Sequence, residues 1–179
     1  MRPVYKKSNA KEIQFEHNNA AYRLYTAGSP EAGRGTTPTI LHASEVAFWT
    51  HDEKILAGLF NGLSQAEGTE VILESTANGA QGEFYRLWQD AIHGRNEYIP
   101  IFIPWFKTSE YTRPIPKDYD MALDEYEEWL VSEFDLTLEQ LYWRRLKVAE
   151  GGPRKFQQEY PAVADEACLL YTSPSPRDS

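Results

Sequence analysis

Hydrophobic and polar residues alternate near the start of the chain and form longer apolar runs further on. Residues 13–15 and 21–25 alternate, which predicts two strands joined by a turn-like His-Asn-Asn sequence. Residues 39–43, 70–74 and 98–104 are more continuously apolar. Strands of a parallel sheet have this pattern because both faces of such a sheet are covered.

Apolar residues spaced three and four positions apart predict helices between and after these strands. The predicted helices cover residues 50–63, 84–91, 118–131, 137–150 and 153–160. Thr50 with Glu53, and Thr137 with Gln140, fit the capping box that satisfies free N–H groups at a helix start. Strands that alternate with helices indicate an α/β fold with a parallel sheet and crossover helices.

The composition is that of an ordinary globular domain, with 41% hydrophobic and 25% charged residues among 179. No apolar run approaches the ~20 residues of a membrane span and no signal peptide opens the chain, so we expect a cytosolic protein with no membrane partner. The net charge of −9 argues against a wholly basic nucleic-acid coat. Residues 1–34 are locally basic and residues 118–139 strongly acidic, and the simpler interpretation of both is solvated surface.

The last residues of the chain look foreign to it. Residues 168–178 match one reading frame of a transposon-type sequencing adaptor at every codon, and Cys168, the only cysteine, lies within this match. We therefore treat residues 168–179 as an adaptor-derived tail. The natural sequence is expected to run to about Ala167 and to belong to a longer parent protein.

Two sequences follow predicted strands at the edge of a parallel sheet where ligands bind. The first is Ser44-Glu45, where a carboxylate could orient a water molecule or hold Mg²⁺. The second is Ser75-Thr76-Ala77-Asn78, whose small polar side chains could contact a phosphate. Alone, each has an ordinary explanation, because acidic strand ends are often solvated and Asn78-Gly79 is a typical turn pair.

A glycine-rich loop before these sequences contains Arg34, between Gly33 and Gly35. Arginine in such a loop can approach a phosphate closely, although it can equally be a surface residue. Residues 28–35 imitate a phosphate-binding loop, but they have Arg where that motif has Lys. A strand follows them instead of the helix that such a loop needs. We therefore find no Walker A loop in the chain.

The combination of segments is more specific than any one of them. In order, they are 33–37 (GRGTT), 41–49 (LHASEVAFW), 74–85 (ESTANGAQGEFY), 103–106 (IPWF), 136–145 (LTLEQLYWRR), 156–161 (FQQEYP) and 165–167 (DEA). Together they resemble the ATPase domain of phage-type terminase large subunits, the motors that package viral DNA. The resemblance covers nearly all of residues 13–167.

This resemblance implies an incomplete parallel α/β sheet of the P-loop (ASCE) ATPase type over residues 1–115. Residues 116–167 would form a helical segment and linker towards a nuclease domain. The implied activity is hydrolysis of ATP with Mg²⁺, coupled to translocation of double-stranded viral DNA. The implied partners are the portal protein, the small terminase subunit and further copies in a homo-oligomeric ring, in the cytoplasm of an infected bacterial host.

Carried over by position, the resemblance also implies roles for single residues. Glu45 would be the Walker B glutamate that activates water, and Ser75-Thr76-Ala77-Asn78 would be the coupling motif. Arg34 would be the finger that reaches the ATP of a neighbouring subunit. Ser44 stands where many relatives have Asp, so we expect it to hold Mg²⁺ only through a bound water.

Two functional parts of the family are absent from this sequence, namely the Walker A lysine and the nuclease carboxylates. We therefore expect the fragment alone to be inactive as an ATPase and as an endonuclease. Two alternatives remain open. A helicase-type P-loop ATPase would need further nucleic-acid motifs after Asn78, and we find none. A degenerate, non-catalytic α/β binding domain is the other alternative, in which Ser44 marks lost chemistry.

Overall fold

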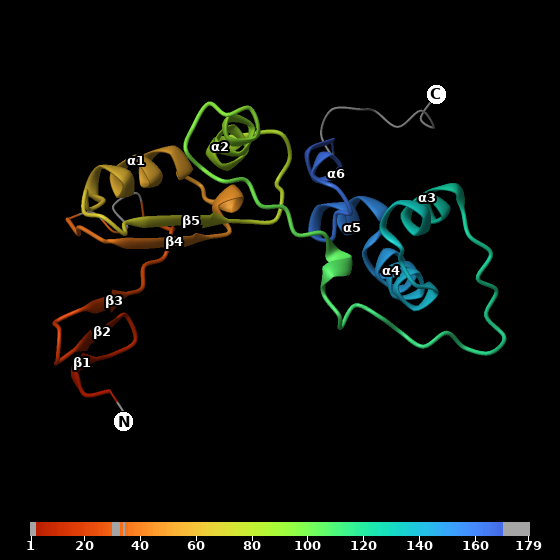
Figure 1. Ribbon diagram of the computed structural model, residues 1–179, viewed down its shortest axis with the longest axis horizontal. Coiled ribbons are helices and arrows are strands. Elements are labelled where there is room, and N and C mark those ends of the chain that lie inside the picture. Colours follow the sequence, from red (N-terminus) through yellow and green to blue (C-terminus); the bar gives the residue numbers. More distant parts are fainter. Residues whose placement is uncertain (1–2, 30–32, 34, 170–179) are drawn as a thin grey trace. The chain divides into compact units, whose positions relative to one another are not determined.

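The computed structural model describes residues 3–29, 33 and 35–169. The chain divides into two compact units, residues 1–74 and 75–179 (Figure 1). The first unit holds both sheets, which are a three-stranded antiparallel sheet and a two-stranded parallel sheet. The second unit is helical. The chain is therefore a mixed α/β protein, as the sequence predicts at this level.

The antiparallel sheet consists of β1 (Tyr5–Ser8), β2 (Glu12–Phe15) and β3 (Ala21–Arg23), in that order. The predicted hairpin between β2 and β3 is confirmed, and Asn19 takes a left-handed φ of 56° in its turn. β1 was not predicted, because Tyr5-Lys6-Lys7-Ser8 has no apolar alternation that would indicate a strand.

The parallel sheet consists of β4 (Ile40–Ser44) and β5 (Glu70–Glu74), which pair from Ile40↔Glu70 to Ser44↔Glu74. The 3-10 helix η1 (Val46–Phe48) and helix α1 (Asp52–Gly62) connect the two strands. α1 buries three aliphatic side chains in the first unit: Ile55, Leu56 and Leu59. The predicted strand–helix–strand unit is thus confirmed for these elements.

The predicted capping box at the start of α1 is wrong. The N-cap residue is His51, and it makes no side-chain cap hydrogen bond. Because the helix begins at Asp52, Glu53 is its second residue and not its third. Glu53 therefore lacks the position from which a capping box side chain returns to the N-cap N–H.

The second unit contains six helical elements within the described residues. They are α2 (Gly82–Ile92), the 3-10 helix η2 (Trp105–Lys107), α3 (Glu125–Phe134), α4 (Leu138–Gly151), α5 (Pro153–Glu159) and α6 (Ala164–Leu169). The capping box of Thr137 and Gln140 is confirmed. The predicted helix over 118–131 is shifted, because Asp124 and Glu127 form a second capping box that starts α3 at Glu125. α6 was not predicted.

The predicted strand over residues 98–104 is wrong for the described structure. The segment forms no ladder there, and Ile99, Ile101 and Ile103 are 82%, 73% and 72% exposed. A strand needs a neighbour for its backbone groups, and none of the described strands pairs with this segment. Pro100 and Pro104 also have no backbone N–H group to donate to a neighbouring strand.

The core of the second unit is built around aromatic side chains. Trp105 and Trp143 stack with ring centroids 5.3 Å apart. Tyr111 also stacks on Trp143, with ring centroids 4.3 Å apart. Phe156 packs edge-on against both tryptophans. These rings join η2 to α4 and α5, so residues far apart in sequence share one core.

The acidic residues of 118–139 are exposed as predicted, with one exception, Glu127, which is buried beside this core. Glu127 is 1% exposed and accepts hydrogen bonds from Arg145 Nε at 2.8 Å and Nη2 at 2.5 Å. Arg145 Nη2 also donates to the carbonyl of Ala122 at 2.7 Å. The hydrogen bond with Glu127 raises the pKa of Arg145 well above its usual range, so the guanidinium stays charged.

We expect Glu127→Ala to destabilise the protein by about 3–5 kcal/mol, because it leaves the Arg145 guanidinium without its carboxylate. Urea unfolding, followed by tryptophan fluorescence, would measure the change. Glu128→Ala is the matched control, since Glu128 is the next residue on α3 and is exposed. Equal midpoints for the two variants would contradict a structural role of the buried pair.

Candidate functional site

Glu45 lies at the carboxyl end of β4, in an unusual backbone conformation. It has φ 56° and ψ 39°, which is the left-handed region. Few residues other than glycine, asparagine and aspartate adopt this conformation, and strain of this kind is concentrated at functional sites. Val46, next in the chain, is fully buried, and Trp49 Nε1 donates to the Ser44 carbonyl at 3.0 Å. These contacts hold the turn, while Glu45 itself is exposed.

The segment predicted to be the coupling motif begins at the end of the neighbouring strand. Ser75 follows Glu74 directly, and Glu74 pairs with Ser44 in the parallel register. Glu45 and Ser75 are therefore the first residues after two adjacent strand ends. In sheets of this kind the ligand crevice lies outside these ends.

The predicted coupling motif itself is half-buried along all four residues, Ser75, Thr76, Ala77 and Asn78. Gly79 follows with a positive φ of 77° and is buried, and α2 begins at Gly82. The motif thus spans the connection between a strand and a helix.

The sequence did not single out His42 and Glu74, which lie at the same edge. His42 Nε2 and Glu74 Oε1 are 3.5 Å apart, and both side chains are about half exposed. Strand alternation could have identified them. Glu74 is the last residue of β5, and His42 lies two positions before the end of β4, on the same face of the sheet as Ser44 and Glu74. Glu74 adds a second carboxylate at this strand end, opposite Ser44 in the ladder.

Oxygen donors at this edge fit the ligand preference of Mg²⁺. Ser44, Glu45 and Glu74 offer a hydroxyl and two carboxylates, and protein-bound Mg²⁺ commonly takes one or two carboxylates together with substrate phosphates and water. No group of three or more His, Cys, Asp or Glu side chains with metal-binding geometry occurs among residues 3–29, 33 and 35–169.

The loop that carries Arg34 is anchored to α1. Arg34 lies outside the described residues, but the glycines on both sides of it are described, with φ of 74° at Gly33 and 78° at Gly35. Gly33 is buried against Leu59 of α1, and Thr36 Oγ1 donates to the Gly33 carbonyl at 2.6 Å. The ends of the loop are therefore fixed within the first unit.

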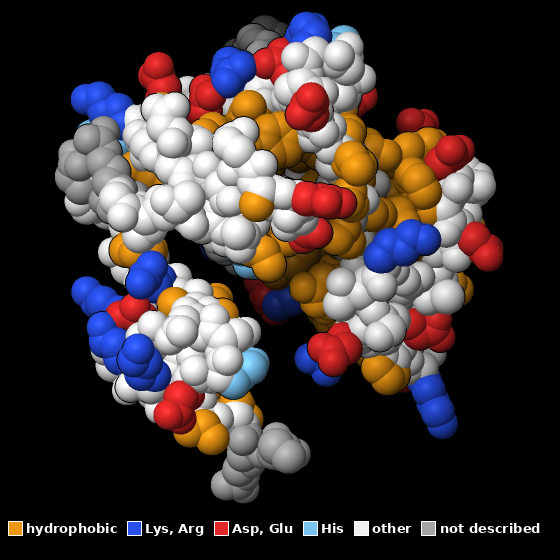
Figure 2. Space-filling model, turned by 60° about the vertical axis from the view of Figure 1, so that its left-hand side comes forward, with side chains coloured by type: hydrophobic (Ala, Val, Ile, Leu, Met, Phe, Trp, Pro, Cys, Tyr) orange, Lys and Arg blue, Asp and Glu red, His pale blue; other side chains and the backbone are white. Residues whose placement is uncertain are grey.

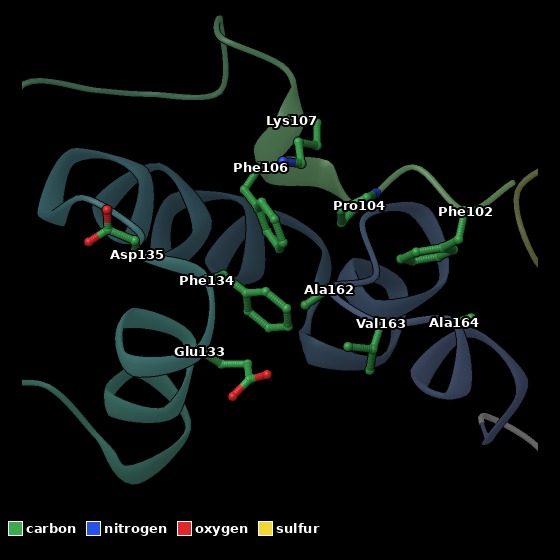
Figure 3. A pocket seen from close by; sticks show the side chains of 10 residues that line it. All are labelled: Phe102, Pro104, Phe106, Lys107, Glu133, Phe134, Asp135, Ala162, Val163 and Ala164. Carbon is green, nitrogen blue, oxygen red and sulfur yellow. The ribbon is translucent and has the colours of Figure 1, made fainter.

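An apolar groove of about 560 Å³ occurs in the second unit (Figure 3). Phe106 and Phe134 face each other in it with centroids 4.9 Å apart, and Glu133 and Asp135 lie at its border. Every residue that lines the groove belongs to the second unit, and none is a site residue predicted from the sequence. The groove is therefore not the predicted nucleotide site.

No protein-family model matches the chain, and no curated protein matches it. Within the described part of the chain, no helix has both the length and the apolar character of a membrane span. The assignment of a function therefore depends on the motifs and on the geometry described above.

Two glycine substitutions test how the Arg34 loop is anchored. Gly35→Ala should cost about 1–2 kcal/mol, because its positive φ disfavours a Cβ while the space around it is open. Gly33→Ala should cost about 1–3 kcal/mol more, since its Cβ would also lie 2.4 Å from Leu59 Cδ2. Urea unfolding measures both variants. If Gly33→Ala were no worse than Gly35→Ala, the loop would not be packed on α1.

Proposed function

We propose that this chain is the hydrolysis half of the ATPase core of a phage-type terminase large subunit. The observation that carries the proposal is the register of the parallel sheet, in which Ser44 pairs with Glu74. This register puts the candidate Walker B glutamate, Glu45, and the candidate coupling motif, Ser75–Asn78, directly after adjacent strand ends. The order of the motifs along the chain and the parallel register of β4 and β5 support the proposal.

In this proposal, Glu45 orients the water that attacks the γ-phosphate of ATP. Its backbone lies in a left-handed turn and the residue is exposed, which suits a group that must meet a ligand. Mg²⁺ and the phosphates would be bound by the phosphate loop of the parent protein, with Ser44 contacting the ion through water. Phosphoryl transfer requires mainly positioning and charge stabilisation, so few side chains suffice.

The proposed coupling depends on Ser75, Thr76, Ala77 and Asn78, which connect β5 to α2. Their hydroxyl and amide groups would contact the γ-phosphate or its water, and loss of that phosphate would change the loop. α2 then moves with the loop, and the motion drives double-stranded viral DNA through a ring of subunits. The ring would act with a portal protein and a small terminase subunit in the cytoplasm of an infected bacterial host.

Glu45→Gln tests the catalytic role in the parent protein that includes its phosphate loop. Because glutamine cannot act as a base, we expect ATP turnover to fall by about 100-fold or more while ATP affinity is kept. Steady-state phosphate release and nucleotide binding measure the two quantities. Glu53→Gln, a neighbouring exposed carboxylate on α1, should leave both unchanged. Undiminished turnover in Glu45→Gln would exclude the proposed role.

A subunit-mixing experiment tests whether Arg34 acts on a neighbouring ATP. Rings of Arg34→Ala subunits alone, or of Glu45→Gln subunits alone, should be inactive. Mixed rings should recover part of the ATPase activity, because some boundaries join an intact Arg34 to an intact Glu45. Phosphate release measured across mixing ratios shows the recovery. A flat, inactive response at every ratio would speak against a finger acting between subunits.

A further inference from the structure

The antiparallel sheet β1–β3 has one aromatic face. Pairing of Tyr5 with Phe15 and of Ile13 with Tyr22 puts these four side chains on the same side of the sheet. Phe15 contacts Tyr5 at 5.6 Å and His17 at 6.4 Å between ring centroids. We call the rings of Tyr5, Phe15, His17 and Tyr22 the aromatic face.

The rest of the described structure does not bury this face. No residue of β1, β2 or β3 is buried, and Tyr5 and Tyr22 are 48% and 63% exposed. Large apolar rings gathered on an open sheet mark a binding surface more often than single exposed residues do. The question is then which partner the face suits.

The local charge of residues 3–29, which include this sheet and its turns, favours a polyanion. Residues 3–29 hold four Lys or Arg against two Glu, whereas the whole chain has a net charge of −9. Figure 2 shows Lys and Arg side chains gathered beside hydrophobic ones over the part of the molecule that ends at the N-terminus. An acidic protein with a locally basic, aromatic sheet has the charge distribution of a nucleic-acid surface.

The carboxylate of this sheet is turned away from the aromatic face. Glu12 pairs across the sheet with Arg23, on the opposite side from Ile13 and Phe15. It forms ion pairs there with Lys7 and Arg23, whose hydrogen bonds lower its pKa. The strand residues of the aromatic face therefore include no acidic side chain that would repel a phosphate.

We propose that the aromatic face binds single-stranded nucleic acid, with unpaired bases stacked on Tyr5, Phe15 and Tyr22. Every base has a π-face, so stacking on such rings tolerates any sequence, while nearby lysines meet the phosphates. Lys6 and Lys11, both exposed, are the two cations of residues 3–29 other than those that pair with Glu12, and we assign this role to them. Bases within a duplex are already stacked on each other, so the face should prefer single strands. The proposal goes beyond the ATPase site and needs no ATP.

Fluorescence anisotropy with the 179-residue chain tests the proposal. The probe is a labelled oligothymidine of about 12 nucleotides, which lies within the site sizes of stacking surfaces. Tyr22→Leu keeps an apolar side chain but removes the ring, so binding should weaken about tenfold or more. Tyr22→Phe keeps the ring and should bind like the unmodified chain. Circular dichroism confirms that both variants are folded.

Salt dependence separates stacking from simple charge attraction. Removing one phosphate contact, by Lys11→Gln, should reduce the slope of log affinity against log salt by about 0.7. An unlabelled duplex of the same length should compete more weakly than the single strand.

Three results would overturn the proposal. They are no binding at low salt, equal binding of Tyr22→Leu and Tyr22→Phe, and competition by the duplex at least as strong as by the single strand. Because no nucleotide hydrolysis is measured, none of these results depends on the proposed role of Glu45.

Discussion

The parallel pairing of β4 and β5 determines where the candidate chemistry lies. Parallel strands can be joined only by a crossover, and α1 makes this crossover by burying Ile55 and Leu56. The same pairing brings the two strand ends to one edge, so Glu45 and Ser75 follow adjacent residues of the ladder. Without the packing of α1, this edge would not exist.

Two local backbone features, at Glu45 and at Gly33, then shape the surroundings of that edge. The left-handed Glu45 is held between the Ser44–Trp49 hydrogen bond and the buried Val46, and Gly33 holds the Arg34 loop against Leu59. Both features depend on α1 or on the turn that leads to it. A single helix therefore supports the sheet and anchors the loop of the candidate finger.

The sequence predicted some features correctly and missed others, and two of the misses depend on distant partners. The capping box of Thr137 and Gln140 spans three positions, and the structure contains it. The segment 98–104 has the composition of a strand, but a ladder needs a neighbour that the pattern cannot supply. Glu127 lies in an acidic stretch typical of surface, and its burial depends on Arg145, 18 positions away. For the site, the sequence placed Glu45 at a strand end but gave no sign of its left-handed backbone.

The central claim is that this chain supplies one half of an ATP site whose other half binds the phosphates. The most direct measurement is the sequence of the DNA that flanks this reading frame. The account predicts an in-frame G-x-x-x-x-G-K-[ST] loop between a strand and a helix, ahead of Met1. An in-frame stop codon upstream of Met1, with no such loop encoded between the stop codon and Met1, would contradict the account.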